Sequence, residues 1–222
     1  PNTQDDKVII NVNATIRSVK GTQTHCALRT GNWDSNTTLK IEIGTSGKLY
    51  GSGGDGGTGG SANETAGTDG QTGSSALGIE YPCSINNLGV IQSGYGGGGG
   101  GGGNTRTTGG GKKSGARTNG SSGGGGGGGA GLPAGAGGGV QTPLAVGGGS
   151  AGSAGAAGSL SNLVSGAGTG GLGGTEAGDG GNASAVNNSA TKADDGETVS
   201  GAASPGTGGN NGFAIITNQG SA

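Results

Sequence analysis

The residues of this chain that could carry out chemistry are few and scattered. His25, its one histidine, stands beside Cys26, and a histidine that activates a cysteine is the usual arrangement of a thiol nucleophile. Neighbouring residues of a strand point to opposite faces, so this pair is poorly placed for proton transfer. We therefore predict that the protein is not an enzyme and uses no cofactor.

The acidic residues Asp194, Asp195 and Glu197 could bind a cation. Neither an EF-hand loop nor a glycine-rich calcium repeat surrounds them in the sequence. A solvated acidic loop explains these residues better, and we predict no metal site.

A group of cations, Arg106, Lys112, Lys113 and Arg117, lies between two glycine runs. The sequence lacks the G-x-x-x-x-G-K-[ST] pattern of a phosphate-binding loop. It also lacks the aromatic residues on which nucleic-acid bases stack, so we predict no nucleic-acid partner. Acidic receptor loops or lipopolysaccharide phosphates are better partners for these cations, and a solvated basic loop is an equal alternative.

The composition is unlike that of an ordinary globular domain. Glycine accounts for 64 of 222 residues, almost all of it after Tyr50, and only 27% of the residues are hydrophobic. Such composition without a strict period is typical of disordered chains. Disorder usually comes with high net charge, whereas the formal net charge here is −2. We therefore expect the glycine to be ordered. The absence of methionine indicates a fragment or processed end of a longer protein.

Short strands are predicted on both sides of the first glycine run. Apolar and polar residues alternate over 6–19 and 39–43, as in strands with one buried face, and 26–29 is a short strand between them. The segment 76–93 alternates in the same way and predicts a β hairpin that brings Cys83 back towards Cys26. A disulfide between the two cysteines and two separate buried thiols are both compatible with the sequence.

The glycine runs separate segments of alternating character. The segments are apolar at 76–93, 132–134, 159–164 and 213–216, and mostly polar at 61–66, 104–122, 140–146 and 175–198. A chain that goes up and down would produce this alternation, with apolar returns at one end and loops at the other. VQTPLAV at 140–146 is apolar although it falls at the loop end. It is either a tip that contacts a partner or a segment that packs against the base.

Extended glycine strands could pack into such an array. A strand of the polyproline-II type has three residues per turn and rises about 3.1 Å per residue, and without Cβ atoms its neighbours can approach from every side. Ordering glycine costs roughly 0.5–1 kcal/mol per residue more than ordering alanine, so an isolated run should be disordered. The predicted fold is mainly β and non-regular with almost no α-helix: a small β module, then a polyglycine-II sandwich of about eight runs.

The motif IEIGTSGKLYGSGGDGGTGG at 41–60, the long glycine runs and the terminal GFAIITN resemble the tip adhesins of T-even-like phage long tail fibres. In that family glycine-rich motifs form a polyglycine-II sandwich, and the intervening loops bind outer-membrane proteins of the host. The resemblance covers roughly 40–217. It implies a virion protein at the distal end of a tail fibre or at a tail tip, with a host outer-membrane protein, lipopolysaccharide and the rest of the fibre as partners, as a monomer or a homotrimer.

On this basis we divide the chain into a β-stranded attachment module at 1–50, a receptor-binding domain at 51–217 with the hairpin at 76–93, and a tail at 218–222. The residues predicted to contact the receptor lie in the loops of the second part. They are Asn63, Glu64, Arg106, Lys112, Lys113, Arg117, Val140, Gln141, Leu144, Val146, Asn187, Asn188, Lys192, Asp194 and Asp195.

An ice-binding protein built on a polyproline-II bundle is the alternative function. Springtail antifreeze proteins have regular flat faces and several disulfides, whereas this chain has irregular loops and two cysteines. A thermal-hysteresis assay would separate the two functions.

Overall fold

The computed structural model describes residues 6–62, 65–108, 117–141, 156–158, 168–174, 177–183, 195–198 and 202–217. Throughout these ranges the chain forms short strands and extended segments and contains no helix, which confirms the predicted class. No helix suited to crossing a membrane is therefore present in this part of the chain.

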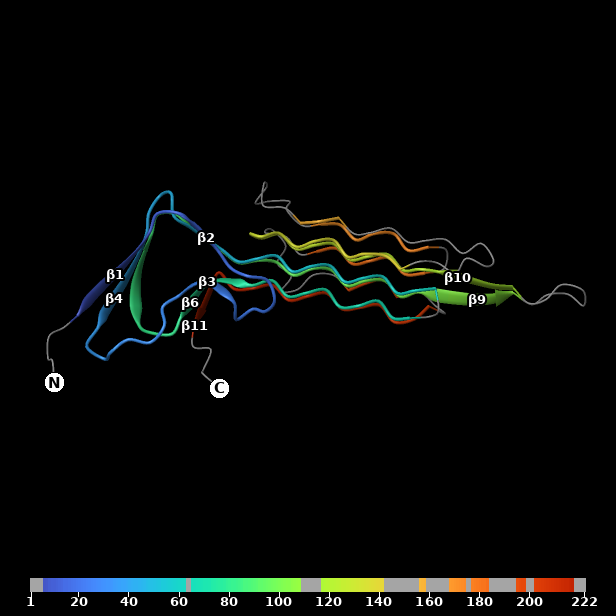
Figure 1. The fold of residues 1–222 in the computed structure, drawn as a ribbon, viewed down its shortest axis with the longest axis horizontal. Helices are drawn as coiled ribbons and strands as arrows, with labels where there is room; N and C mark the ends of the chain where they lie inside the picture. The colour runs from blue at the N-terminus through green and yellow to red at the C-terminus, as the bar shows by residue number, and fades with distance from the viewer. Residues whose placement is uncertain are drawn as a thin grey trace, which may run out of the picture.

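The strands between residues 7 and 92, together with one strand near the C-terminus, form a three-sided parallel β-solenoid (Figure 1). Its coils are β1 (Lys7–Val12), β2 (Thr15–Arg17) and β3 (Cys26–Arg29); β4 (Thr38–Ile43), β5 (Lys48–Tyr50) and β6 (Ser75–Ile79); and β7 (Cys83–Asn87), β8 (Val90–Gln92) and β11 (Ile215–Thr217). Equivalent strands of successive coils pair in parallel, giving the sheets β1-β4-β7, β2-β5-β8 and β3-β6-β11.

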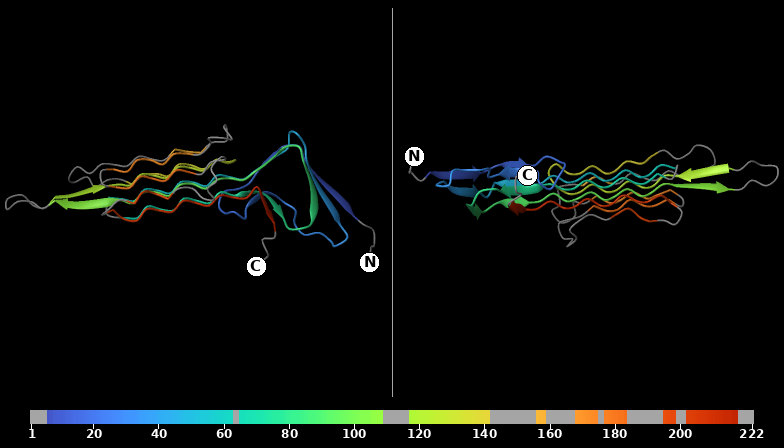
Figure 2. Two further views of the ribbon diagram at one scale, coloured as in Figure 1. Left: turned by 180° about the vertical axis from the view of Figure 1, so that it is seen from behind. Right: turned by 90° about the horizontal axis from the view of Figure 1, so that it is seen from below.

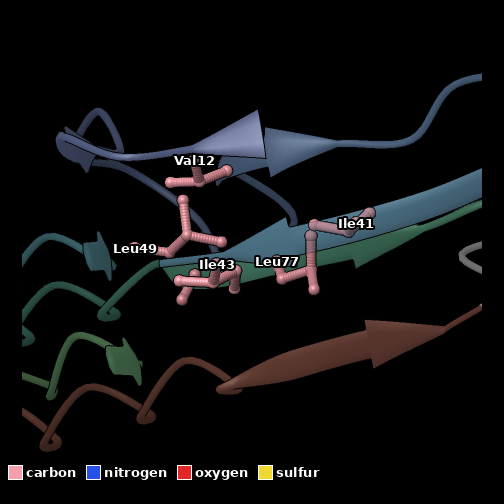
Figure 3. Packing of buried hydrophobic residues seen from close by; sticks show 6 residues of the cluster. Val12, Ile41, Ile43, Leu49 and Leu77 are labelled. Carbon is pink, nitrogen blue, oxygen red and sulfur yellow. The ribbon is translucent and has the colours of Figure 1, made fainter. Parts of the chain in front are cut away.

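The apolar faces of the strands fill the inside of this solenoid. Ile41, Ile43 and Leu49 of the middle coil are at most 1% exposed, and Val12 and Leu77 pack with them (Figure 3). The strands of the outer coils are less covered, because each has a neighbouring coil on one side only.

The expected hairpin at 76–93 is wrong. β6, β7 and β8 lie in three different sheets, and each pairs in parallel with a strand of the preceding coil. The connections between them turn the chain around a corner of the solenoid instead of reversing it. The solenoid therefore contains strands from both sides of the predicted boundary after residue 50.

The two cysteines are free thiols, so the disulfide is not formed. Cys26 lies in β3 and Cys83 in β7, which belong to different sheets. Both thiols are half-buried, so the alternative prediction of two separate buried thiols is confirmed only in part.

The glycine-rich segments leave the solenoid at one corner, between its second and third sides. The excursions comprise 18–25 in the first coil, 51–74 in the second and 93–214 in the third. The short first excursion braces the longer ones. The Lys20 Nζ lies 2.5 Å from Asp55 Oδ1, and the Ser52 hydroxyl donates to the Val19 carbonyl at 3.0 Å.

Beyond this corner the chain runs back and forth as side-by-side extended segments (Figure 2). We name the described segments runs A to J: 51–61, 65–74, 93–103, 122–130, 133–139, 156–158, 168–174, 177–183, 195–198 and 202–212. Runs A and B are antiparallel, because Thr68, Gln71 and Ser74 donate backbone N–H groups to the carbonyls of Thr58, Asp55 and Ser52.

Backbone hydrogen bonds between runs recur at every third residue. In run C the N–H groups of Gly97, Gly100 and Gly103 donate to run B, whereas those of Gly98 and Gly101 donate to run D. Run C also bonds to runs A, H and J, and run D bonds to A, C, E, F, G and H. The two uninterrupted glycine runs are thus the inner members of this glycine array.

Candidate functional site

The end of the glycine array opposite the solenoid carries a β hairpin (Figures 1 and 2). β9 (Asn104–Thr108) follows run C directly, and β10 (Arg117–Ser121) leads into run D. The strands are antiparallel, with Arg106 opposite Asn119 and Arg117 opposite Thr108. The hairpin therefore projects from the two central runs.

The sequence explains why strands replace the glycine runs at this point. Residues 104–108 and 117–121 are rich in threonine, which favours strands. At the root of the hairpin Asn104 is 8% exposed and Ser121 6% exposed. The hairpin is thus fixed at its base by the array.

Two apolar residues lie near the same end. Val140, 37% exposed, and the exposed Gln141 follow Gly139, whose carbonyl accepts from Gly59 near the outer end of run A. Leu172 in run G is 68% exposed, and Gly174 two residues later donates to the carbonyl of Ser122, just after β10. Leu172 was not among the predicted contact residues; its position as the one large side chain of a glycine run was the available signal.

Asp195 lies away from this end, although we predicted it in a contact loop. Its carboxylate accepts from the backbone N–H of Gly208 at 2.8 Å, and the next residue, Gly196, donates to Gly206. Gly206 pairs with Gly100 of run C, so Asp195 lies part-way between the solenoid and the outer end of the array.

Only some of the other predicted contact residues lie within the described part of the chain. Arg106 and Arg117 are brought together by the hairpin register, and Val140 and Gln141 lie near them at the outer end. Outside the described residues are Asn63, Glu64, Lys112, Lys113, Leu144, Val146, Asn187, Asn188, Lys192 and Asp194.

His25 and Cys26, the pair considered as a possible nucleophile and base, form hydrogen bonds to two different backbone carbonyls. A ring nitrogen of His25 lies 3.0 Å from the Lys20 carbonyl, and the Cys26 thiol donates to the Thr24 carbonyl. Burial raises the pKa of Cys26, which opposes formation of a nucleophilic thiolate. An open hollow of about 410 Å³ between β4 and β7 contains Cys83 as its one titratable residue.

No group of three or more His, Cys, Asp or Glu residues suited to a metal ion occurs in the described ranges. Carboxylates of the array instead accept backbone N–H groups of neighbouring runs. Asp55 accepts from Ala136 at 2.6 Å, Asp179 from Gly173 at 2.6 Å and Asp69 from Thr207 at 2.7 Å.

The family model of the phage tail fibre adhesin Gp38 matches residues 1–222. The chain belongs to the Gp38 family. Comparisons with curated proteins and with solved structures find no match. As a Gp38 adhesin the protein is part of the phage tail and serves in attachment to the host cell, and the ice-binding alternative gains no support.

Proposed function

We propose that this Gp38 adhesin lies at the distal end of the tail fibre and binds a host outer-membrane protein through the outer end of its glycine array. One observation carries the proposal: the hairpin β9–β10 lies at the end opposite the solenoid, where it can reach a cell surface (Figure 1). Val140, Gln141 and Leu172 supply apolar and polar contacts beside it.

The glycine array acts in this proposal as a rigid polyglycine-II scaffold. The three-residue interval of its hydrogen bonds supports this assignment, because three residues make one turn of a polyproline-II helix. Run C, with about ten residues, would then span roughly 30 Å. A rigid scaffold that presents variable loops is a common division of labour in recognition.

The solenoid serves in this proposal as the attachment module. Solenoids need capping at their end coils, and here β1 and β11 are outer strands with Ile9 42% exposed and Ile215 41% exposed. Open sheet edges with apolar side chains suit an interface with the rest of the fibre. Both inner runs are enclosed by runs of the same chain, so we propose that one chain forms the array by itself.

The proposed binding is non-enzymatic, and the test is a replacement of residues 105–120 by Asn-Gly, which closes a two-residue hairpin. We expect loss of adsorption of the purified chain to susceptible host cells, with a thermal unfolding midpoint within about 3 °C of wild type. Adsorption at the wild-type level would refute the assignment of the binding end.

A second variant serves as the matched control and tests the other predicted loop. Residues 184–194 are replaced by a Gly/Ser linker of equal length. The residues on either side, Ala183 and Asp195, pair part-way along the shaft, so we expect a smaller effect on adsorption than for the hairpin.

A further inference from the structure

Among the described strands of the solenoid, β11 alone follows the glycine array in the sequence. β1 to β8 lie between residues 7 and 92, whereas β11 comes directly after run J. The sheets β1-β4-β7 and β2-β5-β8 therefore have all three of their strands before the third excursion begins. The sheet β3-β6-β11 has two strands at that point, and the returning chain supplies the third.

The edge of β6 receives the returning chain through backbone hydrogen bonds. The N–H of Ala76 donates to the Phe213 carbonyl at 3.0 Å. The N–H of Leu77 donates to the Ala214 carbonyl at 3.1 Å, and parallel pairing continues with Ile215 opposite Leu77. A ladder of this kind is also how a sheet edge takes up a separate extended peptide.

A polar relay at Ser75 of β6 positions the same strand from the array side. The buried Ser75 hydroxyl accepts from the Phe213 N–H at 3.0 Å and donates to the Gln23 carbonyl. The side chain of Gln23 donates in turn to the Asn211 carbonyl of run J. Since Gln23 lies in the first excursion, two coils of the solenoid contribute to the site that receives β11.

β11 contributes little apolar burial of its own. Ile216 is buried, whereas Ile215 and Thr217 on either side of it are exposed. Phe213, which precedes the strand, is 48% exposed. A strand this short and this exposed needs a further source of stability, because each hydrogen bond of its ladder contributes little net free energy.

Run J supplies that stability by shortening the loop that β11 closes. Without the array, β11 would close a loop of about 120 residues, from 93 to 212. With run J paired, the Gly212 N–H donates to the Gly94 carbonyl at 2.9 Å, and the loop that remains has about five residues. The local concentration of a tethered strand falls roughly as the −3/2 power of loop length, so the array raises that of β11 by about a hundredfold.

We propose that the β6 edge is a docking site for an extended GFAII strand, and that the assembled array gates this site. Run J holds the chain's own strand in place, and detachment of run J opens the site to a separate peptide of the same sequence. Occupancy of the site therefore depends on whether the array is complete. This inference goes beyond the proposed function, because it does not depend on what the array binds.

The test measures binding of a fluorescent peptide, GFAIIT, to the purified full chain. In the wild-type chain β11 occupies the site, so half saturation should need a high peptide concentration. Gly206→Ala/Gly209→Ala places methyl groups 1.9 and 2.0 Å from carbonyl oxygens of run B and so detaches run J. We expect this variant to reach half saturation at a peptide concentration about a hundredfold lower, the factor by which the longer loop dilutes β11.

Two variants and a second peptide accompany this measurement. Gly139→Ala, where no described atom lies within 4 Å of the added Cβ, should bind the peptide as wild type does. Ile215→Ser/Ile216→Ser weakens the chain's own strand outside the array and should also bind the peptide more tightly than wild type. The peptide GFASST should bind none of these chains.

Each result decides one step of the proposal. No gain in peptide binding by Ile215→Ser/Ile216→Ser would refute the docking site. Wild-type binding by Gly206→Ala/Gly209→Ala would refute the gate. If Trp33 fluorescence shows that this variant does not fold, hydrogen exchange of the wild-type chain decides instead.

In the wild-type chain the amides of Ala76 and Leu77 should exchange as fast as those of Gly206 and Gly209, because β11 leaves β6 when run J opens. Slower exchange at Ala76 and Leu77 than in run J would show that β11 stays docked, and would overturn the gate.

Discussion

At the scale of the residue, close approach of neighbouring backbones explains the uninterrupted glycine of run C. A Cβ atom added at Gly98 would lie 1.9 Å from a carbonyl oxygen of run H. At Gly99 it would lie 2.0 Å from a carbonyl oxygen of run J, and at Gly100 it would lie 2.1 Å from one of run A. Three successive residues therefore face three different runs. Run A has neighbours on fewer sides, and every third residue there has a side chain: Ser52, Asp55, Thr58 and Ser61.

This geometry predicts different costs for two glycine-to-alanine substitutions. Gly99→Ala places a methyl group against a backbone atom of run J that is itself hydrogen-bonded, so we expect a loss of about 3 kcal/mol in the free energy of unfolding, the upper end of what an overpacked methyl group usually costs. Gly139→Ala is the matched control, because no atom of the described residues lies within 4 Å of its added Cβ. Denaturant unfolding measures both. Equal costs would contradict the packing of the array.

The side chains on the outside of the array also act at this scale. Asp69 accepts hydrogen bonds from the backbone N–H and the hydroxyl of Thr207, and these bonds lower its pKa, the backbone bond most. Burial and the neighbouring Asp195 act in the opposite direction. A lowered pKa means that folding favours the charged carboxylate.

The pH dependence follows from that sign. The carboxylate of Asp69 stabilises the fold above its unfolded pKa of about 3.9, and this contribution is lost as pH falls through the lower folded value. We expect Asp69→Asn to lower the unfolding midpoint at pH 7 by no more than about 3 °C, because the group is exposed. The difference from wild type should close below about pH 4. A difference that stayed constant from pH 7 to pH 3 would rule out this linkage.

At the scale of the element, glycine content within a run reports how many of its sides are covered. Runs C and D are enclosed and contain the unbroken glycine stretches 96–103 and 123–129. Run A has glycine at two positions in three, and run B at one in three, namely Gly67, Gly70 and Gly73. The sequence at 51–61 and 65–74 shows this three-residue pattern directly. The sequence does not show the relative positions of the runs, because these depend on which distant segments pair.

The strands show the same division between what sequence patterns can and cannot predict. Alternation located β1 and β4, since it records one buried face. It did not show that the predicted strand at 6–19 is two strands, β1 and β2, which lie in different sheets. It cannot identify the partner strand, and β6, β7 and β8 have the alternation of a hairpin although each pairs in parallel with a different strand. Similarly, the cations at 104–117 were evident in the sequence, but the pairing of the strands that carry Arg106 and Arg117 follows only from the register of β9 and β10.

At the scale of the whole molecule, the solenoid and the array are interleaved along the chain. Run A continues from β5 and run B leads into β6, while run C continues from β8 and run J leads towards β11. Every excursion is therefore closed by a pair of strands in the solenoid. Since ordering glycine is costly, we expect the array to lose its order when those strands separate.

A core substitution in the solenoid tests this coupling. Ile41 is fully buried in the middle coil, and Ile41→Ala should cost about 2–5 kcal/mol, or roughly 5–15 °C in the unfolding midpoint. Trp33 fluorescence reports the solenoid, and amide hydrogen exchange of 97–103 reports the array. Both should shift together, and a calorimetric scan should show one transition. Ile9→Ala, at a residue 42% exposed, is the control and should shift both signals less. Two transitions, with exchange in 97–103 unaffected by Ile41→Ala, would instead support independent folding of the solenoid and the array.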